Sequence, residues 1–171
     1  MSIDRIPVPR TDGALWLCGR NDVGPDPEAA LAWADASTIV CLNHIDELAM
    51  RFPEYVEWLR TNMGGRAIWY PIQNFRAPSA RSVMPVVEMI TDRLERGEGV
   101  VMHCAAGQGR AGTLAACVLM ALGASTADAV RTVATHRVFA GPGSPSQWAL
   151  VEGVAAHLAA ANADPGQVHG H

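Results

Sequence analysis

A cysteine and an arginine in one glycine-rich loop are the residues of this chain whose types and spacing could do chemistry. Residues 103–113 read H-C-A-A-G-Q-G-R-A-G-T, so five residues separate Cys104 from Arg110, with Gly107 and Gly109 between them. A glycine-rich loop can adopt positive φ and turn successive backbone N–H groups toward one point, which forms an anion-binding nest. The planar guanidinium of an arginine can hold two oxygens of a tetrahedral anion. The loop therefore predicts a site for a phosphate-like group.

Cys104 is the candidate nucleophile of this site. A helix predicted to start near Arg110 adds its positive end to the nest, and helix N-termini and nearby cations favour the thiolate form of a cysteine. A thiolate that faces a bound phosphoryl group is suited to nucleophilic phosphoryl transfer. The alternative is a buried cysteine before an ordinary strand-to-helix turn. The coincidence of the Cys-x5-Arg spacing, the two glycines, the preceding strand and the following helix disfavours that alternative.

The elements that must position this loop follow from the hydrophobic pattern. A short apolar strand over 100–103 leads into the loop, and an amphipathic helix over 80–96, ended by glycines, precedes that strand. Strands and helices alternate elsewhere. Further strands are expected at 14–18, 38–42 and 67–72, and helices at 27–35, 47–60 with an interruption near Pro53, 112–122, 126–135 and 145–160.

This alternation predicts a single-domain α/β fold with a mostly parallel central sheet of four to five strands and helices on both faces. Ligands of such sheets bind at the carboxyl ends of the strands, where the glycine-rich loop lies. Residues 1–162 are assigned to this domain, and residues 163–171 to a disordered tail.

Composition narrows the class of protein. The chain has 171 residues, of which 49 % are hydrophobic and 18 % charged, as expected for a compact soluble domain. A net charge of −4 argues against nucleic acid or an anionic membrane as the main partner. The first residues lack the apolar region of a secretory signal, and the most apolar run is too short to span a bilayer. The four cysteines lack metal-type spacing, so we expect a reduced cytoplasmic protein with no metal site.

The loop resembles the signature of the protein-tyrosine and dual-specificity phosphatase superfamily, H-C-x-x-G-x-G-R-[ST]-G. The resemblance covers roughly residues 14–158, and the short chain is similar to the compact dual-specificity branch. It implies that Cys104 attacks phosphorus to form a phosphocysteine, that an acid protonates the leaving oxygen, and that water then hydrolyses the intermediate without metal or organic cofactor. Arg110 and the loop would bind phosphate, and His103 would orient the cysteine. The implied phosphate-binding residues are Ala105, Ala106, Gly107, Gln108, Gly109 and Arg110.

Two positions depart from the family pattern. After the arginine the family usually carries Ser or Thr, whose hydroxyl assists breakdown of the phosphocysteine, but here the residue is Ala111. Thr113 carries a hydroxyl two residues further on. The family's general acid is an aspartate in a segment written P-I-x-D, and this chain has Asn74 at that position. The missing hydroxyl at Ala111 predicts slower breakdown of the phosphocysteine. The amide of Asn74 does not exchange a proton at neutral pH as a carboxyl does.

Three explanations of Asn74 stay open. Another acid could act, with Asp46 and Glu47 as candidates, although both also suit a helix cap or the surface. The substrate could have a leaving group that needs little protonation, such as an aryl oxygen. The chain could instead be a slow or inactive phospho-ligand-binding relative (a pseudophosphatase), or a substrate-trapping Asp-to-Asn variant.

Other side chains are candidates for supporting roles. Gln147 ends a segment, G-P-G-S-P-S-Q, that resembles the one preceding the glutamine that positions the hydrolytic water in related phosphatases; it also suits an exposed first helical turn. Arg76 and Arg137 could add positive charge on the substrate side, or be solvated. Cys41 could form a disulfide with Cys104, although a buried structural cysteine is favoured.

The favoured function is hydrolysis of phosphomonoesters, on phosphotyrosine or on mixed phosphoprotein substrates. The variable loop positions Ala105, Ala106 and Gln108 are uncharged, which disfavours phosphoinositides and inositol polyphosphates. A sulfurtransferase of the rhodanese type also uses a cysteine in an arginine-bearing loop. It is disfavoured by the full loop match and by the helices that follow.

Overall fold

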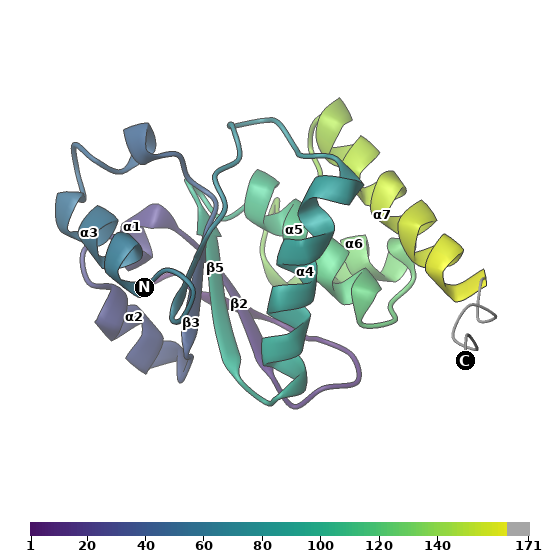
Figure 1. Ribbon diagram of the computed structural model, residues 1–171, viewed down its shortest axis with the longest axis horizontal. Coiled ribbons are helices and arrows are strands. Elements are labelled where there is room, and N and C mark those ends of the chain that lie inside the picture. The colour runs from purple at the N-terminus through teal and green to yellow at the C-terminus, as the bar shows by residue number, and fades with distance from the viewer. Residues whose placement is uncertain (164–171) are drawn as a thin grey trace, which may run out of the picture.

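One central sheet of five strands, in the order β1-β2-β5-β3-β4, organises the molecule (Figure 1). The computed structural model describes residues 1–163. Strands β2 to β5 run parallel to one another, and β1 pairs antiparallel with β2 at one edge. The strands are β1 (Asp4–Ile6), β2 (Ala14–Gly19), β3 (Thr38–Cys41), β4 (Ala67–Trp69) and β5 (Gly99–Cys104). The predicted α/β fold with a mostly parallel sheet is confirmed.

Helices cover both faces of the sheet, as predicted. In Figure 1, α1 to α3 lie on one side of the strands and α4 to α7 on the other. The first group consists of α1 (Arg20–Val23), α2 (Pro27–Ala34) and α3 (Pro53–Asn62), with the short 3-10 helix η1 (Ile45–Glu47) between α2 and α3. The second group consists of α4 (Ala80–Glu95), α5 (Gly109–Ala121), α6 (Thr126–His136) and α7 (Pro145–Ala163).

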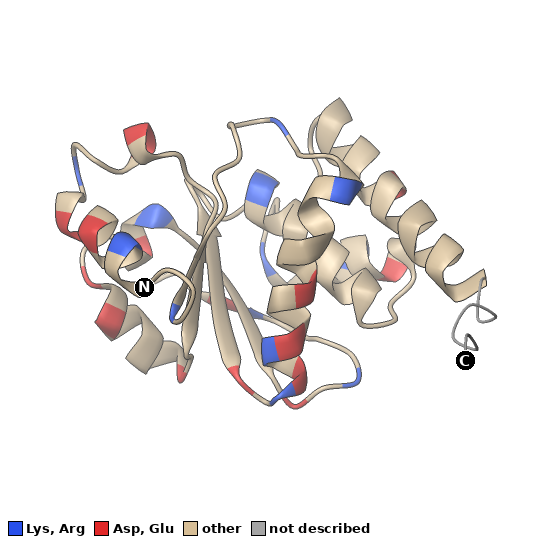
Figure 2. Cartoon of the chain, viewed as in Figure 1, with Lys and Arg blue, Asp and Glu red and all other residues tan. Residues whose placement is uncertain are grey.

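Two hydrophobic cores result, one on each face. Successive residues of a strand point to opposite faces, so in β3 Ile39 belongs to the core beneath α1–α3, while Val40 belongs to the core beneath α4–α7. In β5, Val101 and Met102 divide in the same way. Every residue of β5 is buried, and the charged side chains lie on helices, in loops and on the edge strand β1 (Figure 2). The loop after β5 is therefore held between two packed layers.

The observed boundaries differ from the predicted ones in several places. The edge strand β1 was missed because three residues, two of them charged, carry too little alternation to be recognised. The segment 47–60 holds the end of η1 and most of α3, and α5 begins at Gly109, three residues before the predicted start.

The third predicted strand, 67–72, ends as β4 at Trp69. The chain beyond it stays beside the end of β3, where the N–H groups of Tyr70 and Ile72 donate to the carbonyls of Cys41 and Leu42. Pro71 between them has no N–H to donate, so the ladder becomes irregular there.

The C-terminal assignment is wrong at one residue. Ala163, given to a disordered tail, is the last residue of α7. The rest of that predicted tail, 164–171, lies outside the described residues. Within residues 1–163 no helix is both long enough and apolar enough to cross a membrane.

Candidate active site

The loop between β5 and α5 turns its backbone carbonyls away from one pocket. The carbonyl of Ala105 accepts a hydrogen bond from the N–H of Arg20 (3.2 Å), and the carbonyls of Ala106 and Gly107 accept from the Arg137 side chain (2.7 and 2.9 Å). The C=O and N–H of a trans peptide point in opposite directions. The N–H groups of the next residues, Ala106 to Gln108, therefore point the other way.

Gly107 makes this course of the backbone possible. Its φ is +71°, and a Cβ at this position would lie 2.2 Å from the carbonyl oxygen of Cys18. Both the left-handed conformation and the close approach exclude a side chain. Within residues 1–163 no acceptor pairs with the N–H groups of Ala106, Gly107 or Gln108. The predicted arrangement of inward N–H groups, a nest for an anion, is present in the backbone.

A pocket of about 320 Å³ opens in front of these N–H groups. Cys104, Ala105, Ala106, Gln108, Gly109 and Arg110 line it from the loop, and Asn74, Phe75, Phe139, Gly141, Gly143 and Gln147 line it from two other segments. Cys104 is only 3 % exposed. The structure thus brings the predicted cysteine, arginine, asparagine and glutamine to one cavity, whereas Gly107, also predicted to bind phosphate, is not among the residues that line it.

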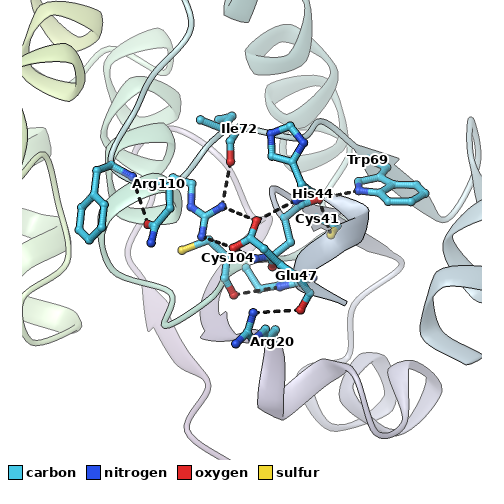
Figure 3. A network of polar contacts seen from close by, with 12 residues as sticks. Arg20, Cys41, His44, Glu47, Trp69, Ile72, Cys104 and Arg110 are labelled. Atoms are coloured by element: carbon cyan, nitrogen blue, oxygen red, sulfur yellow. Dashed lines mark hydrogen bonds and ion pairs between the residues drawn. The ribbon is translucent and has the colours of Figure 1, made fainter. Parts of the chain in front are cut away.

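Arg110 is fixed by a carboxylate that sequence reasoning had proposed for another role. Its Nη1 and Nη2 donate to Oε2 and Oε1 of Glu47, both at 2.8 Å, and Nη1 also donates to the carbonyl of Ile72 at 2.8 Å (Figure 3). An arginine has five N–H donors, so Nε–H and one Nη2 hydrogen remain on the other edge of the guanidinium. That edge can bind two oxygens of a tetrahedral anion while Glu47 binds Nη1 and Nη2 at the end of the guanidinium.

Glu47 is not suited to act as the missing proton donor. Burial by itself raises its pKa, but the hydrogen bonds from Arg110 and from the backbone N–H of His44 outweigh it and lower the pKa to about 2. The carboxyl is therefore ionised at neutral pH, and Glu47 does not line the pocket of Cys104. The helix-cap role weighed for it is present, since it accepts from His44 at the start of η1, and the grip on Arg110 is an additional one.

Asp46, the other candidate acid, also lies away from the pocket of Cys104. Its side chain is exposed and faces a neighbouring hollow together with His44, Gln73 and Asn74. Asn74 borders both hollows and is itself exposed, and its Oδ1 accepts from the N–H of Phe75 (3.1 Å). The position where the resemblance implies a general acid is therefore at the rim of the cysteine pocket, and an amide occupies it.

His103 lies on the opposite face of β5 from Cys104 and is completely buried. Burial lowers its pKa to about 4, so the ring is neutral at pH 7. Nδ1 lies 3.2 Å from the carbonyl of Cys104, which can only accept, so Nδ1 carries the proton. Nε2 then accepts from the hydroxyl of Tyr55 at 2.6 Å. The ring thereby connects α3 to the backbone of the cysteine.

The remaining cysteines are structural, as favoured from the sequence. Cys41 pairs with His103 across the β3–β5 ladder, so its side chain lies on the face opposite to Cys104, which precludes a disulfide between them in this arrangement. Burial raises the pKa of Cys41 to about 12 and that of Cys117 to about 12, and raises the pKa of Cys18 even further. All four cysteines are free thiols, and these three are protonated at neutral pH.

The position after the arginine is buried in the helix. Ala111 has no exposed surface. The hydroxyl of Thr113 donates to the carbonyl of Gly109 at 2.6 Å, inside the first turn of α5. That hydroxyl is engaged with the helix backbone, so it does not replace the side chain absent at position 111.

Gln147 is held against the loop, and the alternative of an exposed helix residue is wrong. It is 2 % exposed, and its Oε1 accepts from the N–H of Gly143 (2.9 Å). Its Nε2 lies 3.3 Å from where a Cβ of Gly109 would be. Ser144 caps this helix, since its Oγ accepts from the N–H of Gln147, and it donates to the carbonyl of Phe75 at 2.7 Å. The start of α7 thus ties the glutamine and the turn of Asn74 together.

Neither of the two arginines that were weighed as substrate-side cations lines the pocket of Cys104. Arg76 is exposed and borders a separate hollow between Tyr70 and Pro78. Arg137 is buried behind the loop and binds its carbonyls. Sequence reasoning also missed Tyr55 and Phe139. A tyrosine in an amphipathic helix and a phenylalanine in a connection carry no local signal for a site, and only the fold brings them to the loop.

Comparisons with known proteins agree with this geometry. The chain matches no curated protein in sequence. The solved structure of kinase associated phosphatase (KAP), with its catalytic-site cysteine replaced by serine, is similar at a TM-score of 0.75 and 21 % identity, over 94 % of this chain and 97 % of that chain. PTPMT1 is similar at a TM-score of 0.72 and 18 % identity, over 94 % and 99 % of the two chains. Tk-PTP in the active form is similar at a TM-score of 0.66 and 22 % identity, over 89 % and 96 %.

At these identities the solved structures show a shared fold. A family model goes further, because it matches residues 17–146, which include the end of β2, all of β3 to β5, the glycine-rich loop and the turn at Asn74. That model is described as the Swiss Army Knife protein, DSP-PTPase phosphatase domain, abbreviated PTP-SAK. The chain belongs to this family of phosphatase domains.

Proposed function

We propose that the chain hydrolyses phosphomonoesters through a phosphocysteine on Cys104. The observation that carries this proposal is the cavity in which Cys104, the inward N–H groups of loop 105–108 and the unoccupied edge of Arg110 converge. The N–H groups and the guanidinium bind the three outer oxygens of a phosphate ester. They also neutralise the charge that these oxygens carry during transfer.

The reaction proceeds in two steps. The Cys104 thiolate attacks phosphorus, the P–S bond forms, and the P–O bond to the leaving oxygen breaks. A water then attacks the phosphocysteine, the P–S bond breaks, and inorganic phosphate and the thiolate are released. Gln147 is buried beside Gly109 with its amide next to the pocket, which suits it to orient this water.

The preferred substrates in this proposal are aryl phosphates, including phosphotyrosine. Among the described residues that line the pocket, Arg110 is the only cation, and none is a carboxylic acid or a histidine. A phenolate departs with little help from an acid, whereas an alkoxide needs a proton. Phe75 and Phe139, both exposed and both at a φ of +63°, flank the pocket and offer apolar surface to a ring.

A single cation in the pocket also bears on the number of phosphates. PTPMT1, one of the similar structures, has been solved in complex with PI(5)P. Here the loop side chains Ala105, Ala106 and Gln108 carry no charge that would hold a further phosphate. This supports esters with one phosphate group.

The four free thiols support a reducing, cytoplasmic setting.

A second candidate function is binding of phosphorylated ligands with little or no turnover. Asn74 and Ala111 favour it, because they remove the proton donor and the hydroxyl that the family uses after the anion has bound. The nest, Arg110 and Glu47 would still provide affinity. The two functions differ in how many equivalents of product the protein releases.

One experiment decides between a phosphatase and a binding protein. It measures hydrolysis of an aryl phosphate by the wild-type chain, by Cys104→Ser and by the control Cys117→Ala. A phosphatase releases many equivalents of phenol, Cys104→Ser releases none above background, and Cys117→Ala, which removes a thiol buried in α5, behaves as the wild type. One equivalent or less from the wild type would identify a binding protein. Equal turnover by Cys104→Ser would refute the cysteine mechanism.

A further inference from the structure

We propose that Arg137 is a positioning residue of the phosphate site, and that the N-terminal strand β1 takes part in the site through it. The inference rests on the proposed phosphate chemistry of loop 104–110. It assigns to Arg137 the task of keeping the N–H groups of that loop directed into the pocket.

Arg137 lies at the C-terminal end of α6 and is 9 % exposed, behind the loop as seen from the pocket. Its guanidinium is almost fully used by the protein. Two bonds reach the loop, from Nε to the carbonyl of Gly107 and from Nη2 to that of Ala106. The others, from Nη1, reach the N-terminal part of the chain at Asp4 (2.7 Å), the carbonyl of Ser2 (3.1 Å) and the carbonyl of Leu17 in β2 (3.3 Å).

The two loop bonds determine the orientation of two consecutive peptides. Because Ala106 and Gly107 present their carbonyls to Arg137, the N–H groups of Gly107 and Gln108 point to the opposite side, where the pocket lies. A rotation of either peptide would place a carbonyl oxygen in front of the bound phosphate. It would replace an attractive dipole with a repulsive one.

This loop needs an external restraint because its own sequence supplies little. Gly107, in the left-handed region at φ +71°, can adopt several other conformations at low cost. Ala105 and Ala106 have no side chain that could bond to the backbone. The planar fork of Arg137 holds both carbonyls at once, which a point charge such as a lysine ammonium does less well.

Asp4 extends this restraint to the edge of the sheet. Its carboxylate lies 2.7 Å from Nη1 of Arg137 and partly neutralises a charge that is otherwise buried. Asp4 itself is held by β1, which pairs with β2 in a fixed register that sets Asp4 opposite Leu17. The chain from Ser2 to Asp4 thus orients the guanidinium that orients the loop.

Helix α6 offers a matched control. Arg131 lies on the same helix, but its side chain is exposed and, among residues 1–163, pairs only with Asp128, three residues earlier. Replacing it removes one positive charge from the same element without touching the loop. A general effect of charge or of α6 stability would appear in both arginine variants.

The test measures how inorganic phosphate protects Cys104 from alkylation by iodoacetate, which requires no turnover. Cys18, Cys41 and Cys117 are buried and protonated, so alkylation at neutral pH reports Cys104. We expect Arg137→Lys to raise the phosphate concentration that gives half protection about tenfold or more, as expected when hydrogen bonds to a charged group are lost. Asp4→Asn should raise it about threefold, in the range of a partly exposed ion pair, and Arg131→Met should leave it unchanged.

Thermal unfolding of each variant separates positioning from a purely structural role. A lower midpoint in Arg137→Lys with unchanged phosphate protection would overturn the inference, and so would an equal loss of protection in Arg131→Met. If Arg137→Lys does not fold, Asp4→Asn decides, and wild-type protection in that variant would overturn the proposal. A wild-type chain that is protected by phosphate but hydrolyses no aryl phosphate would contradict the proposed function and leave this inference standing.

Discussion

At the scale of single residues, Asn74 and Ala111 are the two positions at which this chain departs from the family pattern. The proposed nucleophile Cys104 and the proposed phosphate-binding residue Arg110 lie in the loop and match the family pattern. Asn74 borders the same pocket from another segment, and Ala111 is buried at the start of α5. Asn74 lacks the proton donor that the family carries at its position, and Ala111 lacks the hydroxyl. Both can be restored by a change of a few atoms.

Asn74→Asp restores the proton donor at the rim of the pocket. Because the leaving oxygen of an alkyl ester must be protonated, we expect kcat for an alkyl phosphate to rise about 100-fold, and kcat for an aryl phosphate to rise less. Gln73→Asp is the control, since it adds the same charge one residue earlier, where it faces the neighbouring hollow. No gain in Asn74→Asp would mean that protonation does not limit the rate.

Ala111→Ser restores the hydroxyl that follows the arginine. We expect the phosphocysteine to break down about tenfold faster, the lower range for one added hydrogen bond to a charged group. In rapid-mixing kinetics with an aryl phosphate, the initial burst of phenol should shrink relative to the steady rate. Ala115→Ser adds a hydroxyl one turn later on α5, at a position that is equally buried, and should leave the ratio unchanged. A burst that persists in Ala111→Ser would refute this explanation of slow turnover.

At the scale of elements, the short helix η1 links the end of β3 to the arginine of the loop. Glu47 closes η1 by accepting from the N–H of His44 (2.9 Å) and grips Arg110 with both oxygens. Asn43 adds a bond from its Nδ2 to Oε1 of Glu47 (3.0 Å). The three-residue helix η1 is therefore enough to hold the guanidinium of Arg110, because the Glu47 carboxylate accepts hydrogen bonds from Arg110, His44 and Asn43.

Glu47→Gln tests this connection. The amide keeps one acceptor for Arg110 but loses the charge and the second acceptor, so the guanidinium is held less firmly. We expect kcat/KM for an aryl phosphate to fall about tenfold to 100-fold, which is typical of a misplaced positioning group. Glu57→Gln removes an exposed carboxylate that pairs with Arg60 on α3, and it should change neither kcat nor KM. Wild-type kinetics in Glu47→Gln would show that Arg110 needs no such grip.

The elements also show how far the sequence could predict this site. The helix α4 has strong periodicity, the strand β5 is a continuous apolar run, and the loop after them has a spacing that allows few other interpretations. The grip of Glu47 on Arg110 joins residues 63 positions apart, and the bond from Arg137 to Asp4 joins residues 133 apart. No local pattern encodes such contacts. They depend on the order of strands in the sheet, which places β3 and β2 on either side of β5.

At the scale of the whole molecule, the sheet divides the support of the active site between two cores. Cys104 belongs to the core beneath α4–α7, and the preceding residue, His103, points into the core beneath α1–α3, where it meets Tyr55. A neutral histidine is buried there together with a hydroxyl that donates to it. The stability of the whole fold is therefore linked to the protonation of His103.

The sign of this linkage gives a prediction for the whole molecule. Burial lowers the pKa of His103 from 6.5 to about 4. As the pH falls from 6.5 toward 4, the His103 ring binds a proton in the unfolded chain but stays neutral in the folded protein. The buried neutral ring therefore contributes stability above pH 6.5, and this contribution is lost as the pH approaches 4. At roughly 1.4 kcal/mol per pH unit, this loss reaches about 3 kcal/mol.

Urea unfolding of the wild type, His103→Gln and His136→Gln between pH 7 and pH 4 measures this loss of stability. His103→Gln should be less stable than the wild type at pH 7, because the buried bonds to Tyr55 and to the carbonyl of Cys104 are disturbed. Its free energy of unfolding should then fall less steeply with acid, so that the two curves converge toward pH 4. His136→Gln, which alters an exposed ring on α6, should follow the wild type throughout. Parallel curves for the wild type and His103→Gln would mean that the folded protein accepts the proton as readily as the unfolded chain, and that the neutral ring is not what joins the two cores at the cysteine.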